Sequence, residues 1–160
     1  MSASLVFKKV ARLFVEESKN GLEGRPEFAV SVLAKEAETD PERIILTIDD
    51  MLHDRLILKS GSGTQTYVSP AWRLFLKYDP MFMGWDPQHD AQRIVDDMHN
   101  EADFPLEHNK VLVPRAVASY YDWEPRRLNP TLYYLRDRRG FRVETGLGSA
   151  PYAFSSLYCI

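Results

Sequence analysis

Apolar residues recur at helical spacing in several separate stretches of this chain. The apolar residues Leu5, Val6, Val10, Leu13 and Phe14 fall on one face at a spacing of 3.6 residues per turn, which predicts an amphipathic helix over residues 5–17. The same periodicity predicts six further helices, over residues 28–37, 41–54, 70–77, 90–100, 114–120 and 126–139. The chain is therefore expected to be mainly helical.

Short runs of β-forming residues follow the helices in each half of the chain. Leu56–Leu58 and Gln65–Ser69 flank a turn of glycine and serine, which predicts a hairpin. A second hairpin is predicted over residues 141–155, with its strands at Phe141–Glu144 and Tyr152–Ser155. The expected fold class is mainly α with small β-hairpins, an α+β fold.

Capping residues mark several of the predicted helix ends. Asp40 followed by Pro41 is a strong start, because Asp is a good N-cap and Pro suits the first helical position. Gly140 ends the helix over 126–139. Pro130 inside that helix removes a backbone donor. Either the helix kinks there, or Asn129 is its true N-cap.

The second half of the chain repeats the first in the register that aligns Pro41 with Pro125, here called the repeat register. The other matches in this register are mostly core and turn positions: Ala34 with Ala118, Arg43 with Arg127, Ile44 with Leu128, Thr47 with Thr131, Ile48 with Leu132, Met51 with Leu135 and Ile57 with Phe141. One extra residue in the second hairpin brings Tyr67 onto Tyr152. Two copies of one small fold would retain such positions.

A helix, a tight turn, a second helix and a hairpin occur at Phe28–Val68 and again at Val113–Tyr152. In this the chain resembles the tandem winged helix-turn-helix proteins, which include transcription regulators, plasmid replication initiators and subunits of chromosome-segregation complexes. The resemblance implies two winged-helix units, at residues 1–77 and 89–160, joined by a linker over residues 78–88. Apolar side chains in that linker are expected to pack against one or both units.

Charge is distributed unevenly along the chain, although its net value is only −3. Residues 36–54 hold seven acids against Arg43, and residues 86–107 hold seven acids against Arg93. Residues 115–142 hold seven arginines against three acids. Arginine is the better residue for bidentate contacts to phosphate or guanine.

The predicted third helix of the second copy is a candidate for contact with DNA, because in a winged helix this element enters the major groove. If Leu128, Leu132 and Leu135 face the core, the helical wheel places Arg126, Arg127, Asn129, Tyr133 and Tyr134 on the outside. The predicted DNA-binding residues are Arg115, Arg126, Arg127, Asn129, Thr131, Tyr134, Arg138 and Arg142. The alternative is a solvated helix whose arginines pair with acids of residues 86–107.

A helical wheel of the third helix in the first copy, residues 41–54, predicts an outer face of different character. With Ile44, Ile48 and Met51 inward, an acidic outer face would repel phosphates. An apolar Leu46 in its middle has no evident reason to face water. The predicted protein-interaction residues are Ile45, Leu46, Asp49 and Asp50. The expected partner is the second copy within the same chain, a second molecule of this chain in a homodimer, or another protein.

Sequence motifs that would indicate a metal site, a phosphate-binding loop or a catalytic nucleophile are weak or absent. Asp96 and His99 share one helix face, but no second histidine at metal-ligand spacing or cysteine set accompanies them. The Gly-Ser-Gly turn lacks the Lys-Ser/Thr of a phosphate loop, and no Gly-x-Ser-x-Gly occurs. We therefore expect no enzymatic activity, cofactor or metal. A lone Cys159 excludes an internal disulfide, and no long apolar run predicts a membrane span.

The sequence favours a cytoplasmic protein that binds double-stranded DNA through its second copy, as a transcription regulator or a replication or partition accessory. The first copy then supplies the protein contact. The alternative is a protein-interaction subunit of a larger complex in which neither copy touches nucleic acid. Charge pairing at the predicted third helix of the second copy discriminates between them, because paired arginines are not available to phosphates.

Overall fold

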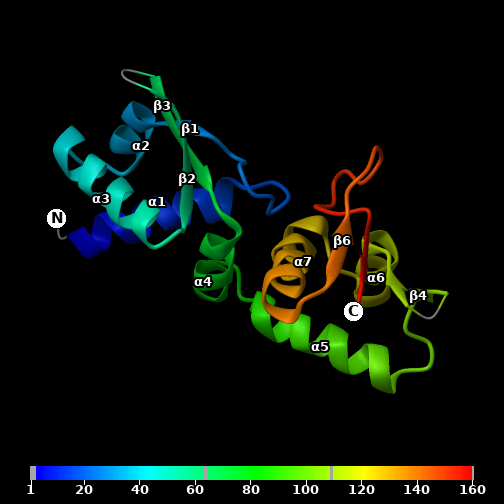
Figure 1. The fold of residues 1–160 in the computed structure, drawn as a ribbon. Coiled ribbons are helices and arrows are strands. Elements are labelled where there is room, and N and C mark those ends of the chain that lie inside the picture. The colour runs from blue at the N-terminus through cyan, green and yellow to red at the C-terminus, as the bar shows by residue number, and fades with distance from the viewer. Residues whose placement is uncertain (1–2, 63–64, 109, 160) are drawn as a thin grey trace. The chain divides into compact units, whose positions relative to one another are not determined.

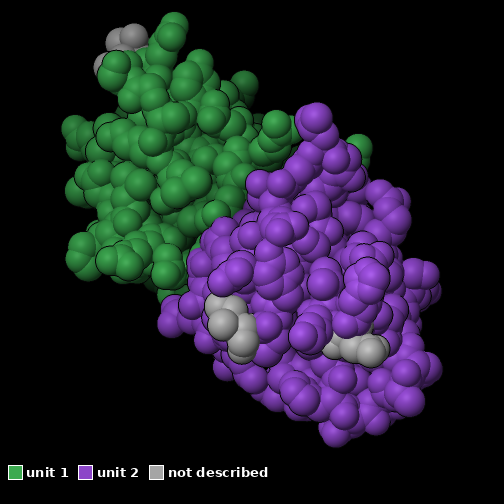
Figure 2. All heavy atoms as spheres, turned by 45° about the vertical axis from the view of Figure 1, so that its right-hand side comes forward, with its two compact units in different colours: residues 1–19, 23–84 green, residues 20–22, 85–160 purple. Residues whose placement is uncertain are grey.

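The computed structural model describes residues 3–62, 65–108 and 110–159, and divides the chain into two compact units. Unit 1 consists of residues 1–19 and 23–84, and unit 2 consists of residues 20–22 and 85–160 (Figure 2). Seven helices and two small antiparallel sheets make up the regular structure of the described residues, which confirms the α+β class. None of these helices is long and apolar enough to cross a membrane.

Unit 1 has four helices and a three-stranded sheet of order β1-β3-β2 (Figure 1). Its elements are α1 (Ala3–Glu17), β1 (Phe28–Ala29), α2 (Val30–Glu36), α3 (Pro41–His53), β2 (Ile57–Ser62), β3 (Gln65–Pro70) and α4 (Trp72–Phe82). The core is formed by apolar faces of α1, α2, α3 and α4, with Phe14, Leu33, Ile44 and Phe75 fully buried.

Unit 2 has three helices and a four-stranded sheet of order β4-β5-β7-β6. Its elements are α5 (Pro87–Asn100), β4 (Leu106–Glu107), β5 (Val111–Leu112), α6 (Pro114–Tyr121), α7 (Pro125–Arg139), β6 (Arg142–Glu144) and β7 (Ser156–Tyr158). Leu128, Leu132 and Leu135 are buried, which confirms the predicted core stripe of α7.

Both units contain a helix, a short strand, two helices and a hairpin in the same order, and unit 1 adds α4 after its hairpin while unit 2 adds β4 before its short strand β5. The three helices begin at positions that match in the repeat register: Ala3 and Pro87, Val30 and Pro114, and Pro41 and Pro125. In each unit the strand before the second helix pairs with the last strand of the hairpin. The predicted repeat is therefore matched by the start of each of these helices.

Strand register corrects the predicted second hairpin. Phe28 and Lys59 both pair with Val68, and their counterparts in the repeat register, Leu112 and Val143, both pair with Leu157. Val68 would fall on Tyr152 in that register, so the second hairpin loop is longer by five positions, from 152 to 157, and not by one. The returning strand is Ser156–Tyr158, and the predicted strand Tyr152–Ser155 belongs to the loop.

Three other boundaries differ from the sequence prediction. The division between the two units falls within the predicted linker over 78–88, at Gly84 and Trp85, but the linker is shorter than predicted, because α4 continues through the buried Tyr78 and Asp79 to Phe82 and α5 already begins at Pro87. Phe28 starts a strand and not a helix, because it pairs with Val68. α7 runs unbroken from Pro125 with Pro130 inside it, so Asn129 is not an N-cap.

Candidate functional site

α7, the helix predicted to enter DNA, is enclosed on several sides. Its buried residues are Arg126, Leu128, Asn129, Pro130, Thr131, Leu132, Tyr133 and Leu135. Eight buried residues on a helix of 15 leave no continuous outer face over its first three turns. A recognition helix must present side chains to the groove, so this arrangement is unsuited to reading bases.

Asn129 was predicted to face DNA, and this is wrong because its side chain is fully buried. Its Nδ2 donates to the carbonyl oxygens of Asn20 at 2.8 Å and Pro151 at 2.9 Å. Its Oδ1 accepts from the backbone N–H of Ala153 at 2.9 Å. These three bonds use both amide protons and the carbonyl, so Asn129 fastens two loops to α7.

The segment Asn20–Leu22 covers the side of α7 that the helical wheel placed outside. A Cβ on Gly21 would lie 2.8 Å from the Arg126 carbonyl oxygen and 2.9 Å from Pro130 Cδ. Arg126 itself is only 5% exposed, so its predicted DNA contact is wrong. No local sequence signal connects Asn20 to Asn129, which is 109 residues away in the chain.

Arg127 and Thr131 are also held inside unit 2, which contradicts their predicted contact with DNA. The Arg127 guanidinium donates to both carboxylate oxygens of Asp90, at 2.8 and 2.9 Å, and the Asp90 side chain is 3% exposed. The Arg127 guanidinium also lies 4.4 Å from the Trp123 ring centroid. Thr131 is fully buried, and its Oγ1 donates to the Pro87 carbonyl oxygen at 3.4 Å.

Further aromatic and acidic side chains lie next to Arg127, Asp90 and Trp123. Tyr121 stacks on Trp123 with ring centroids 4.3 Å apart, and its hydroxyl donates to Asp97 Oδ2 at 2.6 Å. Burial, and then the hydrogen bond to Asp97, raise the pKa of Tyr121 above its ordinary value. Acids of residues 86–107 therefore provide partners for Tyr121 of α6 and Arg127 of α7, and among the arginines of α7 an ion pair with this segment is observed for Arg127.

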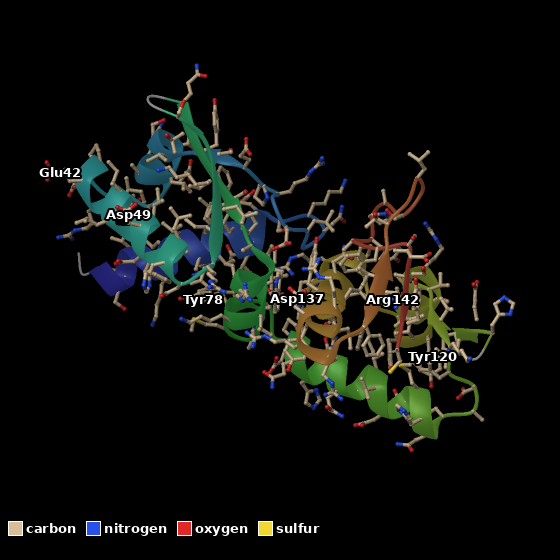
Figure 3. All side chains as sticks on the ribbon, viewed as in Figure 1. Glu42, Asp49, Tyr78, Tyr120, Asp137 and Arg142 are labelled. Carbon is tan, nitrogen blue, oxygen red and sulfur yellow. The ribbon has the colours of Figure 1, made fainter. Side chains whose placement is uncertain are left out.

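Three of the predicted DNA-contacting arginines remain exposed: Arg115 at the start of α6, Arg138 near the end of α7 and Arg142 on β6. Figure 3 labels Arg142. Within the described residues none of them forms an ion pair. Arg142 lies 5.8 Å from the Tyr158 ring centroid. Tyr134, also predicted to contact DNA, is half-buried. The exposed cations thus come from three different elements.

The outer face of α3 in unit 1, defined by Glu42, Ile45, Leu46 and Asp49, has the opposite character. Ile45 is 51% exposed and Leu46 is 65% exposed, although both are large apolar side chains. Asp49 and Asp50 are exposed beside them, and Figure 3 shows Glu42 and Asp49 on the same helix. The predicted outward orientation of these residues is confirmed.

A hollow of about 470 Å³ adjoins this face. Its lining combines Val30 and Ala34 from α2, Ile45 and Asp49 from α3, and Lys59 and Thr66 from the hairpin. Most of the lining is apolar, with one acid, Asp49 from α3, and one base, Lys59 from β2. The sequence pattern indicated the exposed face but not the hollow, because the hollow depends on how α2 and the hairpin flank α3.

No protein-family model, curated protein or solved structure matches this chain. Within the described residues there is also no group of three or more His, Cys, Asp or Glu side chains that could hold a metal ion. The geometric contrast that remains is between two corresponding helices. The outer face of α7 is covered by unit 2's own chain, whereas the outer face of α3 is exposed.

Proposed function

We propose that this chain is a tandem winged-helix protein that acts as a non-enzymatic interaction subunit and binds a partner protein through unit 1. The observation that carries the proposal is the exposure of Ile45 and Leu46 beside a hollow of about 470 Å³. The shared order of helices and strands in the two units supports the winged-helix assignment.

Energetics favour a protein ligand for the outer face of α3. Full burial of an Ile or Leu side chain contributes about 1.5–3 kcal/mol. Ile45 is 51% and Leu46 65% exposed, so covering what remains exposed contributes about 2–4 kcal/mol, and the other contacts of the hollow must supply the rest of a micromolar affinity of about 8 kcal/mol. Contiguous exposed apolar groups with a polar rim are typical of protein-binding sites. Nucleic acid is disfavoured there, because Glu42, Asp49 and Asp50 would repel phosphates.

A selection of random peptides displayed on phage tests this function with the full chain as bait. We expect purified peptides to bind the wild-type chain, and Ile45→Ser with Leu46→Ser to weaken them at least about tenfold in fluorescence polarisation. Leu147→Ser is the matched control, because Leu147 is a fully exposed leucine in unit 2. Equal affinity for the wild-type chain and the doubly substituted chain would contradict the proposal.

Contact with DNA is a second candidate function, favoured by the exposure of Arg115, Arg138 and Arg142. With the outer face of α7 covered, these cations would meet phosphates and not base edges, so binding would be independent of sequence. We expect a mobility shift at about 50 mM salt that disappears by about 200 mM and weakens with Arg138→Ala. Absence of a shift at low salt removes this candidate.

A further inference from the structure

We infer that the outer face of α3 and its hollow bind a short, non-helical, basic segment of a partner protein, with an apolar side chain beside Ile45 and Leu46. This inference rests on the proposed docking function and adds the conformation and the charge of the ligand. It follows from the repeat, from the acids on α3 and from the size of the hollow.

The repeat supplies a template for the conformation. In the repeat register, Ile45 corresponds to Asn129 and Leu46 corresponds to Pro130. In unit 2 the face containing Asn129 and Pro130 is occupied by the irregular segment Asn20–Leu22, with Gly21 against Pro130. The same place on the scaffold therefore already accepts irregular chain in unit 2.

The anchoring chemistry differs between the two copies. Asn129 holds its covering loops through three hydrogen bonds to backbone atoms. Ile45 and Leu46 offer no side-chain hydrogen bond, so a ligand on α3 must contribute apolar side chains there. At about 470 Å³ the hollow has room for a few side chains and not for a folded domain.

Charge decides which partner suits this face. Exposed acids border Ile45 and Leu46 at Glu42, Asp49 and Asp50, whereas Lys59 stands on the hairpin side of the hollow. A second copy of the chain docking here face to face would bring these acids against their equivalents, and like charges across an interface are unfavourable. Lysine or arginine side chains in the ligand would instead be attracted to α3.

The experiment uses the peptides selected by the full chain. We expect the selected sequences to carry a net positive charge with at least one apolar residue. Asp49→Lys with Asp50→Lys should weaken them at least about tenfold, and salt should weaken them by screening. Asp96→Lys is the matched control, because Asp96 is an exposed helical acid in unit 2, and should change affinity less than about twofold.

The outcomes separate this inference from the docking function. Some selected peptides could require Ile45 and Leu46 for binding and yet be acidic or neutral, or bind equally well after the charge reversal at Asp49 and Asp50. Such peptides overturn the inference about a basic ligand but leave the docking function standing. Peptides that gain helical circular dichroism on binding overturn the non-helical conformation. If no selected peptide depends on Ile45 and Leu46, both the inference and the docking function fail.

Discussion

Asn129 has its side-chain hydrogen-bonding groups satisfied inside unit 2, so its removal leaves unpaired backbone groups. We expect Asn129→Ala to lower the free energy of unfolding by about 3 kcal/mol, because the carbonyls of Asn20 and Pro151 and the N–H of Ala153 lose their partners. Urea denaturation followed by circular dichroism measures this change. Asn100→Ala, at an exposed helix end, is the control. A change below about 1 kcal/mol would show that water replaces the amide without loss.

Gly21 is required both by its backbone conformation and by its surroundings. At φ +66°, any other residue costs about 1–2 kcal/mol, and a Cβ 2.8 Å from the Arg126 carbonyl oxygen adds about 1–3 kcal/mol of strain. Gly140 has φ +71° and open space where a Cβ would lie, so Gly140→Ala carries only the first of these costs.

We therefore expect Gly21→Ala to destabilise the protein more than Gly140→Ala does, by about 1–3 kcal/mol in thermal or urea unfolding. The difference isolates the close approach of the covering segment to α7. Equal losses in the two variants would mean that Gly21 matters for its backbone angle alone.

At this scale the sequence predicted both faces of α3 and the core stripe of α7 correctly, but it predicted the outer face of α7 incorrectly, for a physical reason. A helical wheel assigns one buried stripe, and Ile44, Ile48 and Met51 form such a stripe on α3. On α7 the polar Asn129 and Thr131 are buried as well, because backbone carbonyls distant in the chain, those of Asn20 in a loop and Pro87 at the start of α5, accept their hydrogen bonds. No local sequence pattern around α7 indicates that these distant backbone groups will accept hydrogen bonds from Asn129 and Thr131.

The contact between α5 and α7 includes the ion pair of Asp90 and Arg127. Removing one member of a buried pair strands the other charge, so we expect Asp90→Val to cost about 3 kcal/mol. The loss falls at the lower end for buried pairs, because the Arg127 side chain is 29% exposed and reaches water. Asp96→Val, on the exposed side of α5, is the control and should cost under about 1 kcal/mol.

The repeat suggests a compensating change. Val6 of α1 matches Asp90 in the repeat register and is fully buried. Adding Arg127→Met to Asp90→Val should therefore recover about 1–2 kcal/mol, because an apolar pair replaces the stranded cation. A double-mutant cycle in urea measures the coupling, and strictly additive losses would contradict the ion pair's role.

The start of a helix that has a clear capping residue was predicted well, whereas very short strands and a helix that contains a proline were not. α3 begins at Pro41 as expected, because Asp40 accepts the Arg43 N–H at 2.8 Å. β1 and β5 are two residues long, too short to show an alternating pattern, so they exist only through their pairing partners. The end of α4 was taken for a linker because Pro80 is a helix breaker, yet burial of Tyr78 and Asp79 carries the helix through it.

Across the whole molecule, the repeat register seen in the sequence aligns the starts of three helices of unit 2 with those of three helices of unit 1. It did not predict the longer loop before β7, whose Pro151 and Ala153 help to fasten Asn129. The same scaffold thus has a covered third helix in one unit and an exposed one in the other. That difference lies in loops, which retain no helical or strand periodicity.

Acidic residues on α3 should keep the whole molecule from associating with itself through Ile45 and Leu46. We expect the wild-type chain to show no self-association through this face in sedimentation equilibrium at low salt, because two such faces would bring like charges together. Glu42→Gln with Asp49→Asn and Asp50→Asn should promote association, because the apolar pair then meets without repulsion. Adding Leu46→Ser to that variant should reverse it. A wild-type dimer that Leu46→Ser dissociates would instead identify a second copy of the chain as the natural occupant of the face.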